Sequence, residues 1–330
     1  MKAISIDDPG GPESLQLTEV AEPRPEAGEV TIDVAFAGVG FVDVLLRRGA
    51  FSLPMPLTPG IEVSGRVREI GLGVEHLSPG EPVAALLNDF VNLRGAGGYA
   101  EVAKARAALT VRLDAHVDLA TAASVLVNGA TAWMAISTLA RVQKDECVLV
   151  LGATGGLGAL LGQLARKAGA ARIIGVVGSA AKREVAARLG YSDVLAADDL
   201  ATSLKRVMAD RGVDVVFDPV GGSARRIAFE HLAPLGRLVI LGNASGVDES
   251  FSGDAFWHGS KAVMGLSLGA MAHLFPDRVA AAARQVLGWA ARNDLATEPP
   301  LVLPLAEAAD AHRMLEARKV SGKIVLRVAA

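Results

Sequence analysis

The chain has 330 residues, which is enough for two domains that each bury a core of their own. Hydrophobic residues make up 51% and charged residues 21%, a globular composition, and the formal net charge is only −3. This charge and the lack of a long basic run exclude an extended nucleic-acid surface. The N-terminus lacks the apolar segment of a secretory signal, and no run of about 18 uninterrupted apolar residues predicts a membrane span. We therefore expect a cytoplasmic protein with no membrane partner.

The first part of the chain, up to about residue 120, predicts a compact β domain. Short apolar or alternating stretches are separated by Gly and Pro, as in sheets built from short strands. The expected strands are "EVTIDVAFAGVG" (29–40), "IEVSGRVREIG" (61–71), "EPVAALL" (81–87) and "GGYAEVAKA" (97–105).

From about Thr121 onward, apolar strands alternate with amphipathic helices, which predicts βαβ units and a parallel sheet. Near residue 297 this pattern breaks, and a helix at 305–319 and a last strand at 322–328 follow. We expect this tail to close back onto the first domain. The strands of the parallel sheet are expected at 147–152, 172–177, 193–195, 213–218 and 236–242.

A glycine cluster joins the first of these strands to the next helix, in "LGATGGLGALLGQLARKAG" (151–169). Gly155 and Gly158 match the last two glycines of the dinucleotide fingerprint, and Ala153 occupies the first position. Small residues there allow a tight turn, a close approach of backbone to pyrophosphate, and packing of helix on strand. The strand before and the helix after the cluster supply the context that the motif requires. The alternative interpretation is a tight strand–helix turn in another kind of α/β protein.

The end of the next strand predicts which dinucleotide is bound. NAD-specific sites place Asp or Glu there for the ribose 2′-hydroxyl. Here the strand ends in Val177, Gly178 and Ser179, and no carboxylate follows until Glu184. Lys182 lies one turn on and could donate charge-assisted hydrogen bonds to a 2′-phosphate. The pattern favours NADPH, although Lys182 and its neighbour could simply form a solvated helix face.

Several ordered motifs over some 300 residues resemble the medium-chain dehydrogenase/reductase superfamily, in its zinc-free quinone oxidoreductase branch, to which ζ-crystallin belongs. "AGVGFVDVLLRRGAF" is similar to the family segment "GVNF-D----G-Y", and "LPLTPGIEVSGRVREIGLGVEHLSPGEPVA" to its "PG-E--G-V--VG--V----GD-V" run. "NGATAW", "GATGGLG", "GRLVILGNASG" and "PLAEAADAHRMLEARKVSGKIVL" complete the resemblance. It implies an α/β protein: a GroES-like catalytic domain from 1–124 and 297–330, and a Rossmann NADPH-binding domain from 125–296 with a doubly wound parallel sheet.

The resemblance also implies cofactor contacts at matching positions. Backbone of the glycine loop meets the pyrophosphate, the end of the second strand takes the 2′-phosphate, and the loop after "GRLVILG" lines the nicotinamide ribose. One departure is Ala197, where relatives often carry a Tyr beside the adenosine phosphate. The implied contacts are Thr131, Thr154, Gly155, Gly156, Leu157, Gly178, Ser179, Lys182, Gly242, Asn243, Ser245 and Lys323.

No metal is expected. Zinc-dependent relatives carry Cys and His ligands where this chain has Gly40 and Ile61. Their structural zinc needs four cysteines, whereas Cys147 is the only one here, and we expect it to be buried and inert. The six histidines, which show no ligand spacing, are His76, His116, His231, His258, His273 and His312.

Without zinc to polarise an alcohol, the resemblance implies hydride transfer from NADPH to a quinone or similar electron-poor acceptor. The proton donor stays unassigned, because the Asn and Tyr positions of relatives hold Gly40 and Leu45. Asp43 is a candidate acid, although in the family this position often serves structure, and Tyr99 is expected to be structural. The residues expected to line the substrate pocket are Phe41, Leu45, Phe51, Trp257 and His258.

Two alternative functions stay open on these residues: an enoyl or alkenal reductase, and a non-catalytic NADPH-binding protein. The physiological substrate is not readable from the sequence. For assembly, the apolar segment "SKAVMGLSLG" (260–269) predicts an exposed sheet edge. Relatives pair this edge across a two-fold axis, so we expect a homodimer.

Overall fold

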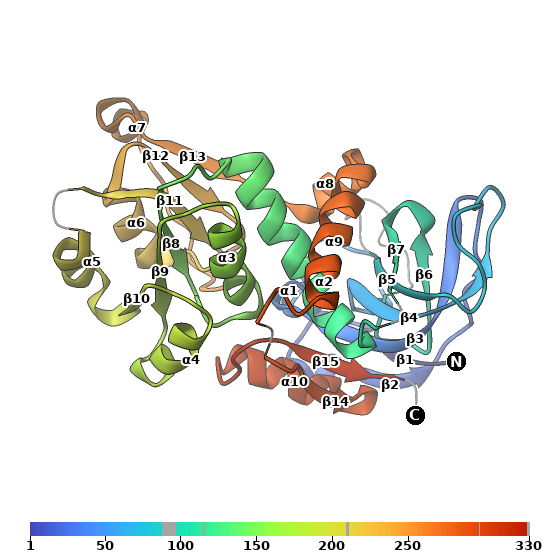
Figure 1. The fold of residues 1–330 in the computed structure, drawn as a ribbon. Coiled ribbons are helices and arrows are strands. Elements are labelled where there is room, and N and C mark those ends of the chain that lie inside the picture. Colours follow the sequence, from blue (N-terminus) through green and yellow to red (C-terminus); the bar gives the residue numbers. More distant parts are fainter. Residues whose placement is uncertain (88–96, 115, 209–210, 297, 329–330) are drawn as a thin grey trace. The chain divides into compact units, whose positions relative to one another are not determined.

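The computed structural model describes residues 1–87, 97–114, 116–208, 211–296 and 298–328. The chain divides into two compact units, shown in Figure 1. Unit 1 comprises Met1–Ala130 and Leu268–Ala330, and unit 2 comprises Thr131–Ser267. The expected fold class, a GroES-like β domain with a Rossmann domain, is confirmed by the sheets described below.

Unit 1 is built around a mainly antiparallel sheet, in which only the β14–β15 pair of the described strands is parallel, with a few helices. Its strands are β1 (Lys2–Ser5), β2 (Gln16–Glu19), β3 (Glu29–Val39), β4 (Glu62–Ile70), β5 (Pro82–Leu86), β6 (Val102–Arg106), β7 (Thr110–Arg112), β14 (Leu301–Pro304) and β15 (Ile324–Arg327). Its helices are α1 (Phe41–Arg47), α2 (Leu119–Trp133, which runs on into unit 2), α8 (Leu268–Leu274), α9 (Pro276–Ala291) and α10 (Ala308–Glu316). Single 3₁₀ turns lie at Pro12–Ser14, Ala107–Leu109 and Leu305–Glu307.

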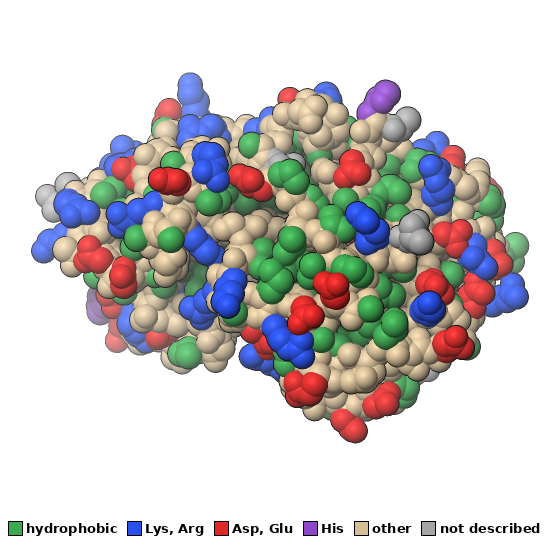
Figure 2. Space-filling view, turned by 90° about the horizontal axis from the view of Figure 1, so that it is seen from below, with side chains coloured by type: hydrophobic (Ala, Val, Ile, Leu, Met, Phe, Trp, Pro, Cys, Tyr) green, Lys and Arg blue, Asp and Glu red, His purple; other side chains and the backbone are tan. Residues whose placement is uncertain are grey.

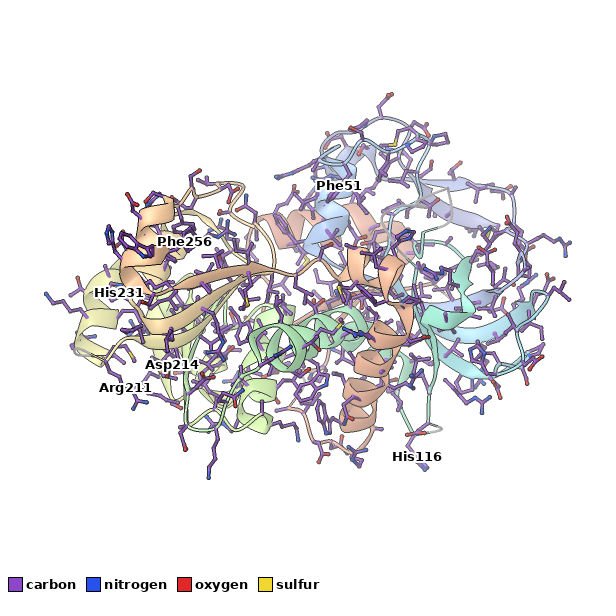
Figure 3. All side chains as sticks on the ribbon, turned by 90° about the horizontal axis from the view of Figure 1, so that it is seen from above. Phe51, His116, Arg211, Asp214, His231 and Phe256 are labelled. Carbon is purple, nitrogen blue, oxygen red and sulfur yellow. The ribbon has the colours of Figure 1, made fainter. Side chains whose placement is uncertain are left out.

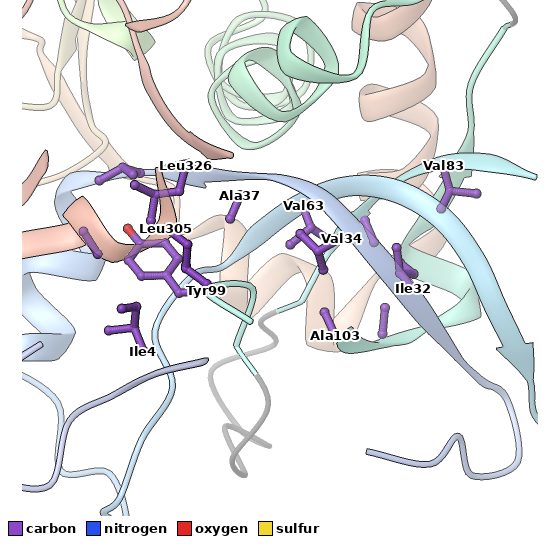
Figure 4. Packing of buried hydrophobic residues seen from close by; sticks show 14 of the residues in the cluster. Ile4, Ile32, Val34, Ala37, Val63, Val83, Tyr99, Ala103, Leu305 and Leu326 are labelled. Carbon is purple, nitrogen blue, oxygen red and sulfur yellow. The ribbon is translucent and has the colours of Figure 1, made fainter. Parts of the chain in front are cut away.

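The large sheet of unit 1 has the order β14-β15-β3-β4-β5-β7, and β6 pairs with β3. The last strand, β15, is antiparallel to β3, with Ile324 opposite Val39, so the expected return of the tail onto the first domain is confirmed. Alternate residues of β3, among them Val30, Ile32 and Val34, are buried in the main core of the unit. Figure 4 shows Ile32 and Val34 packed with Val63 and Ala103 from the neighbouring strands. Burial of each such aliphatic side chain contributes roughly 1.5–3 kcal/mol.

The segment 268–296 groups with unit 1, whereas the sequence analysis placed it in the nucleotide domain. The reason is apolar packing: Val279 and Ala283 of α9 face Leu109 and Leu126 of unit 1. The structure forms α9 over this stretch, and the apolar face of an amphipathic helix does not by itself specify which core it covers. The expected boundary residue 297 lies outside the described residues.

Unit 2 contains the parallel sheet. Its strands are β8 (Cys147–Leu151), β9 (Arg172–Val177), β10 (Asp193–Ala196), β11 (Val213–Asp218), β12 (Leu232–Ile240) and β13 (Ala262–Gly265). Its helices are a π-helical stretch (Met134–Ala140), α3 (Gly156–Lys167), α4 (Arg183–Arg188), α5 (Leu200–Met208), α6 (Gly222–Glu230) and α7 (Gly253–Gly259), with 3₁₀ turns at Ala180–Lys182 and Ala197–Asp199.

The sheet of unit 2 has the order β10-β9-β8-β11-β12-β13, and its ladders are parallel. All five residues of β8 are buried, as expected for a central strand covered on both faces. Leu149 and Leu151 belong to a core cluster with Leu204 of α5 and Phe229 of α6. Helix α3 packs on β8 and β9 (Figure 1). The predicted edge at 260–269 is confirmed, because β13 ends the sheet order.

One helical run, Leu119–Ala140, is long and apolar enough to cross a membrane by length and composition alone. Polar residues such as Thr121, Asn128 and Ser137 interrupt this run. A search for uninterrupted apolar residues, as in the sequence analysis, therefore does not detect it. Most of its apolar window is buried inside the structure, as is usual for a core helix.

Candidate functional site

The site expected from the sequence lies at the carboxyl edge of the sheet in unit 2. From β8 the chain proceeds to β9 and β10 on one side, and β11, β12 and β13 follow on the other. The order therefore reverses between β8 and β11, and ligands of open α/β sheets bind outside the carboxyl ends at such a switch point. Loops 152–155, 178–182, 219–222 and 241–248 follow the strands that surround it.

Two glycines, one in the β8–α3 loop and one in the first turn of α3, are required by the fold itself. Gly152 has φ +69°, in the left-handed region that favours glycine. A Cβ on Gly158 would lie only 2.2 Å from the carbonyl oxygen of Gly152, so α3 could not pack this closely on the strand with a larger residue there. These two positions explain the tight turn that the motif predicts.

Two other glycines leave space that the described part of the chain does not fill. Gly155, the N-cap of α3, has φ −72°, and a Cβ there would meet nothing nearer than the Gly152 carbonyl at 3.5 Å. A Cβ on Gly178 would meet no described atom within 4 Å. Neither glycine is needed for the fold. Gly155 leaves room at the first turn of α3, where backbone N–H groups and the helix dipole favour an anion, and Gly178 leaves room at the end of β9.

Tyr191 holds α3 against the sheet from behind the loop. It is buried, its hydroxyl donates to the Gly158 carbonyl at 2.6 Å, and its ring fills the space beside Gly162 and Gly175. A Cβ on Gly162 would lie 2.6 Å from the ring, and one on Gly175 2.8 Å from it. Sequence reasoning missed Tyr191, whose role depends on packing between α3 and β9.

The loop after β9 has the composition that favours a phosphate. The side chain of Val177 is 1% exposed and belongs to the core, whereas Gly178 and Ser179 are exposed. Lys182 ends the 3₁₀ turn that follows and is partly exposed. Figure 2 shows Lys and Arg side chains mixed with Asp and Glu side chains over the face that it draws. The start of α4 adds the exposed Arg183.

The structure adds a carboxylate that the sequence analysis overlooked. Ala196, the last residue of β10, pairs with Val177, so the turn Ala197–Asp199 follows at the same edge as Gly178. Asp198 is exposed there, at the place next to the one where relatives often have Tyr. Only the strand order, in which β10 lies beside β9, makes this neighbour visible.

The loops after β11 and β12 are hydrogen-bonded to each other along their length. Ser245 N donates to the Val220 carbonyl at 2.8 Å, and Gly222 N donates to the Val247 carbonyl at 2.8 Å. Val220 in turn reaches the glycine loop, since a Cβ on Gly152 would lie 3.1 Å from its Cγ2. The structure thereby brings the predicted residues Gly242, Asn243 and Ser245 to the switch point with the glycine loop. Thr154 is 4% exposed within that loop, and Thr131 is 8% exposed on α2.

Lys323, the one predicted cofactor contact in unit 1, has a protein partner. Its Nζ lies 2.6 Å from Oε1 of Glu62, and both side chains are less than a tenth exposed. The other carboxylate oxygen of Glu62 accepts from the Val127 backbone N–H at 2.8 Å. Lys323 Nζ also lies 3.7 Å from the position that a Cβ on Gly40 would take. An ammonium group therefore borders the space that an Asn side chain occupies in relatives.

Asp43 is buried completely and is tied to backbone on both sides. Oδ2 accepts from Gly40 N at 2.8 Å, and Oδ1 accepts from Gly60 N at 3.0 Å. Burial raises the pKa of Asp43 to about 6, while the two backbone hydrogen bonds and Lys323 act against this rise. The carboxylate connects the start of α1 to the turn at Gly60, which has φ +100°. These contacts are those of a structural residue, which was the alternative to an acid role for Asp43 in the sequence analysis.

Tyr99 and His312 form a second buried polar pair in unit 1. The Tyr99 hydroxyl lies 3.2 Å from His312 Nε2, and neither residue is exposed. Nδ1 of His312 is buried without a hydrogen-bond partner in the described part of the chain. Burial and the nearby Arg47 lower the pKa of His312 to about 3, so the imidazole is neutral. Tyr99 lies in the main core, as Figure 4 shows, in agreement with the structural role expected for it.

The predicted pocket-lining residues fall into two groups. Phe41 and Leu45 lie on α1 and Phe51 follows it, and all three are partly buried. Phe51 packs on a small cluster that includes Leu57 and is labelled in Figure 3.

Trp257 and His258, in contrast, lie at the amino edge of the parallel sheet in unit 2, away from the glycine loop. They are near the end of α7, just before β13, where the Leu235 N–H donates to the Ser260 carbonyl at 2.7 Å. Figure 3 shows the neighbouring Phe256 at the same end as His231, which precedes β12. Trp257 is 74% exposed, so it is no part of the carboxyl-edge site within this unit.

Comparisons with known proteins agree with this architecture. Residues 26–115 match the family model "Alcohol dehydrogenase GroES-like domain", and residues 156–285 match "Zinc-binding dehydrogenase". A mouse quinone oxidoreductase-like protein 2 is 30% identical over 317 residues, covering 94% of this chain and 88% of the relative. The chain belongs to the quinone oxidoreductase family of medium-chain dehydrogenases/reductases.

Two further similarities extend the comparison. Escherichia coli quinone oxidoreductase, solved in complex with NADPH, superposes with a TM-score of 0.90 at 27% identity and covers 99% of this chain and 100% of its own. A phenolphthiocerol/phthiocerol polyketide synthase subunit of Mycobacterium tuberculosis is 31% identical over 329 residues. This chain spans 98% of its own length in that match but only 15% of the synthase subunit.

One of the family models is named for zinc, but the residues of this family member do not fit that metal. Gly40 and Ile61, at the ligand positions of zinc-dependent relatives, carry no ligand atom in their side chains. Within the described residues, no group of three or more His, Cys, Asp or Glu side chains could hold a metal ion. Cys147 is 3% exposed, and burial raises its pKa to about 11, which makes a thiolate ligand unfavourable.

Proposed function

We propose that this protein is an NADPH-dependent oxidoreductase that reduces a quinone or a similar electron-poor acceptor without a metal ion. The observation that carries the proposal is the open space at Gly155, the N-cap of α3, and at Gly178, the residue after β9, since the fold does not require glycine at either position. Family membership and the NADPH complex of the Escherichia coli relative support the same ligand.

The two ends of the dinucleotide would be held by different loops of unit 2. Backbone N–H groups of Gly155, Gly156 and Leu157 would bind the pyrophosphate at the helix terminus. Gly178, Ser179 and Lys182 would bind the 2′-phosphate, with Val177 contributing no acceptor for a ribose hydroxyl. The loop of Gly242, Asn243 and Ser245 would hold the nicotinamide ribose, and Thr131 would lie near the nicotinamide.

NADPH supplies a hydride, and the acceptor gains a proton as well, so that a quinone, NADPH and one proton give a hydroquinone and NADP⁺. The protein's task is to orient the two reactants and to bind the anionic oxygen that develops. Asp43 is not suited to proton donation, since both of its oxygens accept from backbone N–H groups. Protonation of a hydroquinone anion by solvent requires no side-chain acid.

A separate observation favours a second class of acceptor, the α,β-unsaturated thioesters. The whole chain aligns with part of a polyketide synthase subunit, and polyketide synthesis handles carbon chains as thioesters. An α,β-unsaturated thioester is an electron-poor alkene that could accept hydride at its β-carbon. An enoyl or alkenal reductase is therefore the alternative, and a non-catalytic NADPH-binding protein is the alternative from another class.

We further propose that the protein is a homodimer paired through β13. This strand is one of the two edge strands of the six-stranded sheet, the other being β10, and an unpaired edge invites pairing with a second copy.

An acceptor panel tests the proposed function. NADPH consumption is measured with a benzoquinone, an alkenal, a short enoyl thioester and no acceptor, each with a protein-free control. Turnover with the quinone above the protein-free rate is expected. Turnover confined to the thioester would establish the reductase alternative, and tight NADPH binding without any turnover would establish the non-catalytic one.

A further inference from the structure

A buried ion pair stands at the carboxyl edge of unit 2, and no step of the proposed function uses it. Asp218, the last residue of β11, is 0% exposed. Its Oδ1 accepts from Val220 N at 2.7 Å and from Gly221 N at 2.8 Å, so it fixes the turn that begins α6. Its Oδ2 accepts from Nε of Arg225, one turn into α6.

Arg225 connects this turn to the neighbouring loop. It is 1% exposed, and its guanidinium has three different partners. Besides Asp218, Nη2 donates to the Gly242 carbonyl at 2.7 Å, and Nη1 pairs with Asp248 at 2.5 Å. Gly242 and Asp248 bracket the loop that contains Asn243 and Ser245. One planar group therefore holds both ends of that loop against the end of β11.

Backbone geometry makes the two loops a single unit. Gly221 and Gly222 have φ +80° and +63°, and a Cβ on Gly221 would lie 2.0 Å from Oδ1 of Asn243. Ala244 N donates to the Pro219 carbonyl at 3.2 Å, which adds to the contacts of Ser245 and Val247 described above. The loop consequently lies directly on the glycine turn that Asp218 fixes.

The energetics of a buried ion pair indicate that its role here is to fix geometry more than to add stability. A buried ion pair contributes little net stability compared with apolar residues of similar size, because both charges lose their hydration. It does fix the positions of its partners, since a planar guanidinium can donate hydrogen bonds only in a narrow range of directions. Here the group whose position is fixed is a loop that faces the switch point.

We propose that Asp218 and Arg225 are positioning residues that set the Gly242–Val247 loop for the nicotinamide half of the dinucleotide. This inference rests on the proposed NADPH function. The adenosine half lies with other loops, those after β8 and β9, and none of the hydrogen bonds of Arg225 described above reaches them. Loosening Arg225 therefore affects one half of the ligand and spares the other.

The test compares Arg225→Lys with a matched control, Arg237→Lys. Arg237 also forms a largely buried ion pair in unit 2, with Glu146 at 2.7 Å, and also holds a carbonyl, that of Ala140 at 2.7 Å. Its partners Glu146 and Ala140 both precede β8, so this ion pair lies at the amino edge of the sheet and not at the carboxyl edge. Both variants keep the positive charge and lose the several N–H donors of the planar guanidinium, so each variant loses comparable hydrogen bonds.

Two nucleotides serve as probes in titration calorimetry: NADPH, and adenosine 2′,5′-bisphosphate, which lacks the nicotinamide half. Arg225→Lys is expected to weaken NADPH by about tenfold, the effect of one charged hydrogen bond, and to leave the bisphosphate within about twofold. Arg237→Lys is expected to lower thermal stability and leave both affinities within about twofold. Equal loss of both probes in Arg225→Lys, or an equal NADPH loss in the two variants, would overturn the proposal.

Amide hydrogen exchange on the nucleotide-free proteins gives a second readout. Faster exchange over residues 241–248 is expected in Arg225→Lys and not in Arg237→Lys. Unchanged exchange there overturns the positioning claim. Because this measurement needs no nucleotide, it decides the claim even if wild type bound neither probe, a result that would refute the proposed function instead.

Discussion

Lys323 and Glu62 form a buried ion pair in unit 1, with Nζ and Oε1 2.6 Å apart and exposures of 8% and 1%. Glu62 is also bound to the α2 backbone at Val127, so the pair connects β4, α2 and the segment before β15. The sequence resemblance implied a cofactor role for Lys323, and the structure gives it a structural partner in addition.

Removing the lysine should therefore cost stability. Lys323→Met leaves Glu62 buried without its counter-charge, and the free energy of unfolding is expected to fall by about 3–5 kcal/mol. The double variant Lys323→Met/Glu62→Gln should recover most of this loss, because no buried charge is left and the Gln carbonyl can still accept from Val127 N. Urea unfolding of the wild type, Lys323→Met and the double variant measures the effect. Equal losses in the single and double variants would show that packing matters here and charge does not.

The buried His312 predicts a pH dependence of stability. Its folded pKa of about 3 lies below the ordinary histidine value of 6.5, so between these values the unfolded state binds a proton that the folded state does not. Stability must then fall as pH decreases from about 6.5 toward 3, by up to about 1.4 kcal/mol for each pH unit. His312→Gln keeps a partner for Tyr99 and removes the titration.

Asp43 acts in the opposite direction, because its folded pKa of about 6 exceeds the ordinary aspartate value of 3.8. The unfolding free energy of wild type minus that of His312→Gln isolates the histidine, since both proteins contain Asp43. This difference is expected to drop steadily between pH 6.5 and 4. A difference that is flat over this range would mean that the imidazole is already protonated in the fold.

Cofactor choice depends on the loop after β9. We expect NADPH to bind at least about tenfold more tightly than NADH, since charged hydrogen bonds contribute roughly 1.5–3 kcal/mol each. Lys182→Ala should weaken NADPH and barely change NADH, and Val177→Asp should shift the preference toward NADH. Tryptophan fluorescence titrations with both cofactors measure this. Equal weakening of both cofactors in Lys182→Ala would assign that lysine a structural role.

Local patterns in the sequence were sufficient to predict the strand–glycine–helix unit at 147–167 and the return of the last strand to the first domain. Both depend on residues close in sequence or on motifs that specify a fold. The position of Trp257 and His258 could not be predicted in this way. Their part in the substrate pocket stays a prediction from similarity, and within unit 2 they lie on α7, which follows β12 as a crossover and ends at the amino edge of the sheet.

The same limit applies to Asp198 and to the pair Asp218 and Arg225. Asp198 comes near Gly178 only because β10 lies beside β9, and Arg225 reaches Gly242 only because β12 lies beside β11. Such contacts follow from strand order, which a single sequence does not specify. Residues 268–296 illustrate a further gap, because an amphipathic helix shows its apolar face but not the core that it covers.

Assembly through β13 makes a specific prediction. Light scattering at micromolar concentration should give the mass of a dimer for wild type. Met264→Lys places a charge on the edge strand, which natural edges use to prevent pairing, and should shift the protein toward monomer. Leu17→Lys, on the separate two-stranded sheet of unit 1, is the matched control and should stay dimeric. A wild-type monomer would show that the protein does not form the dimer. A dimer unaffected by Met264→Lys would show that the two copies pair elsewhere.

The most direct test of the proposed metal-free, NADPH-dependent reduction is a product balance with a benzoquinone. The protein is dialysed against excess chelator, its metal content is determined, and NADPH consumed is compared with hydroquinone formed, with protein-free and NADH reactions alongside. The account predicts one hydroquinone for each NADPH, a rate unchanged by the chelator, and slower reaction with NADH. Loss of activity on chelation that zinc restores, or no quinone reduction above the protein-free rate, would contradict it.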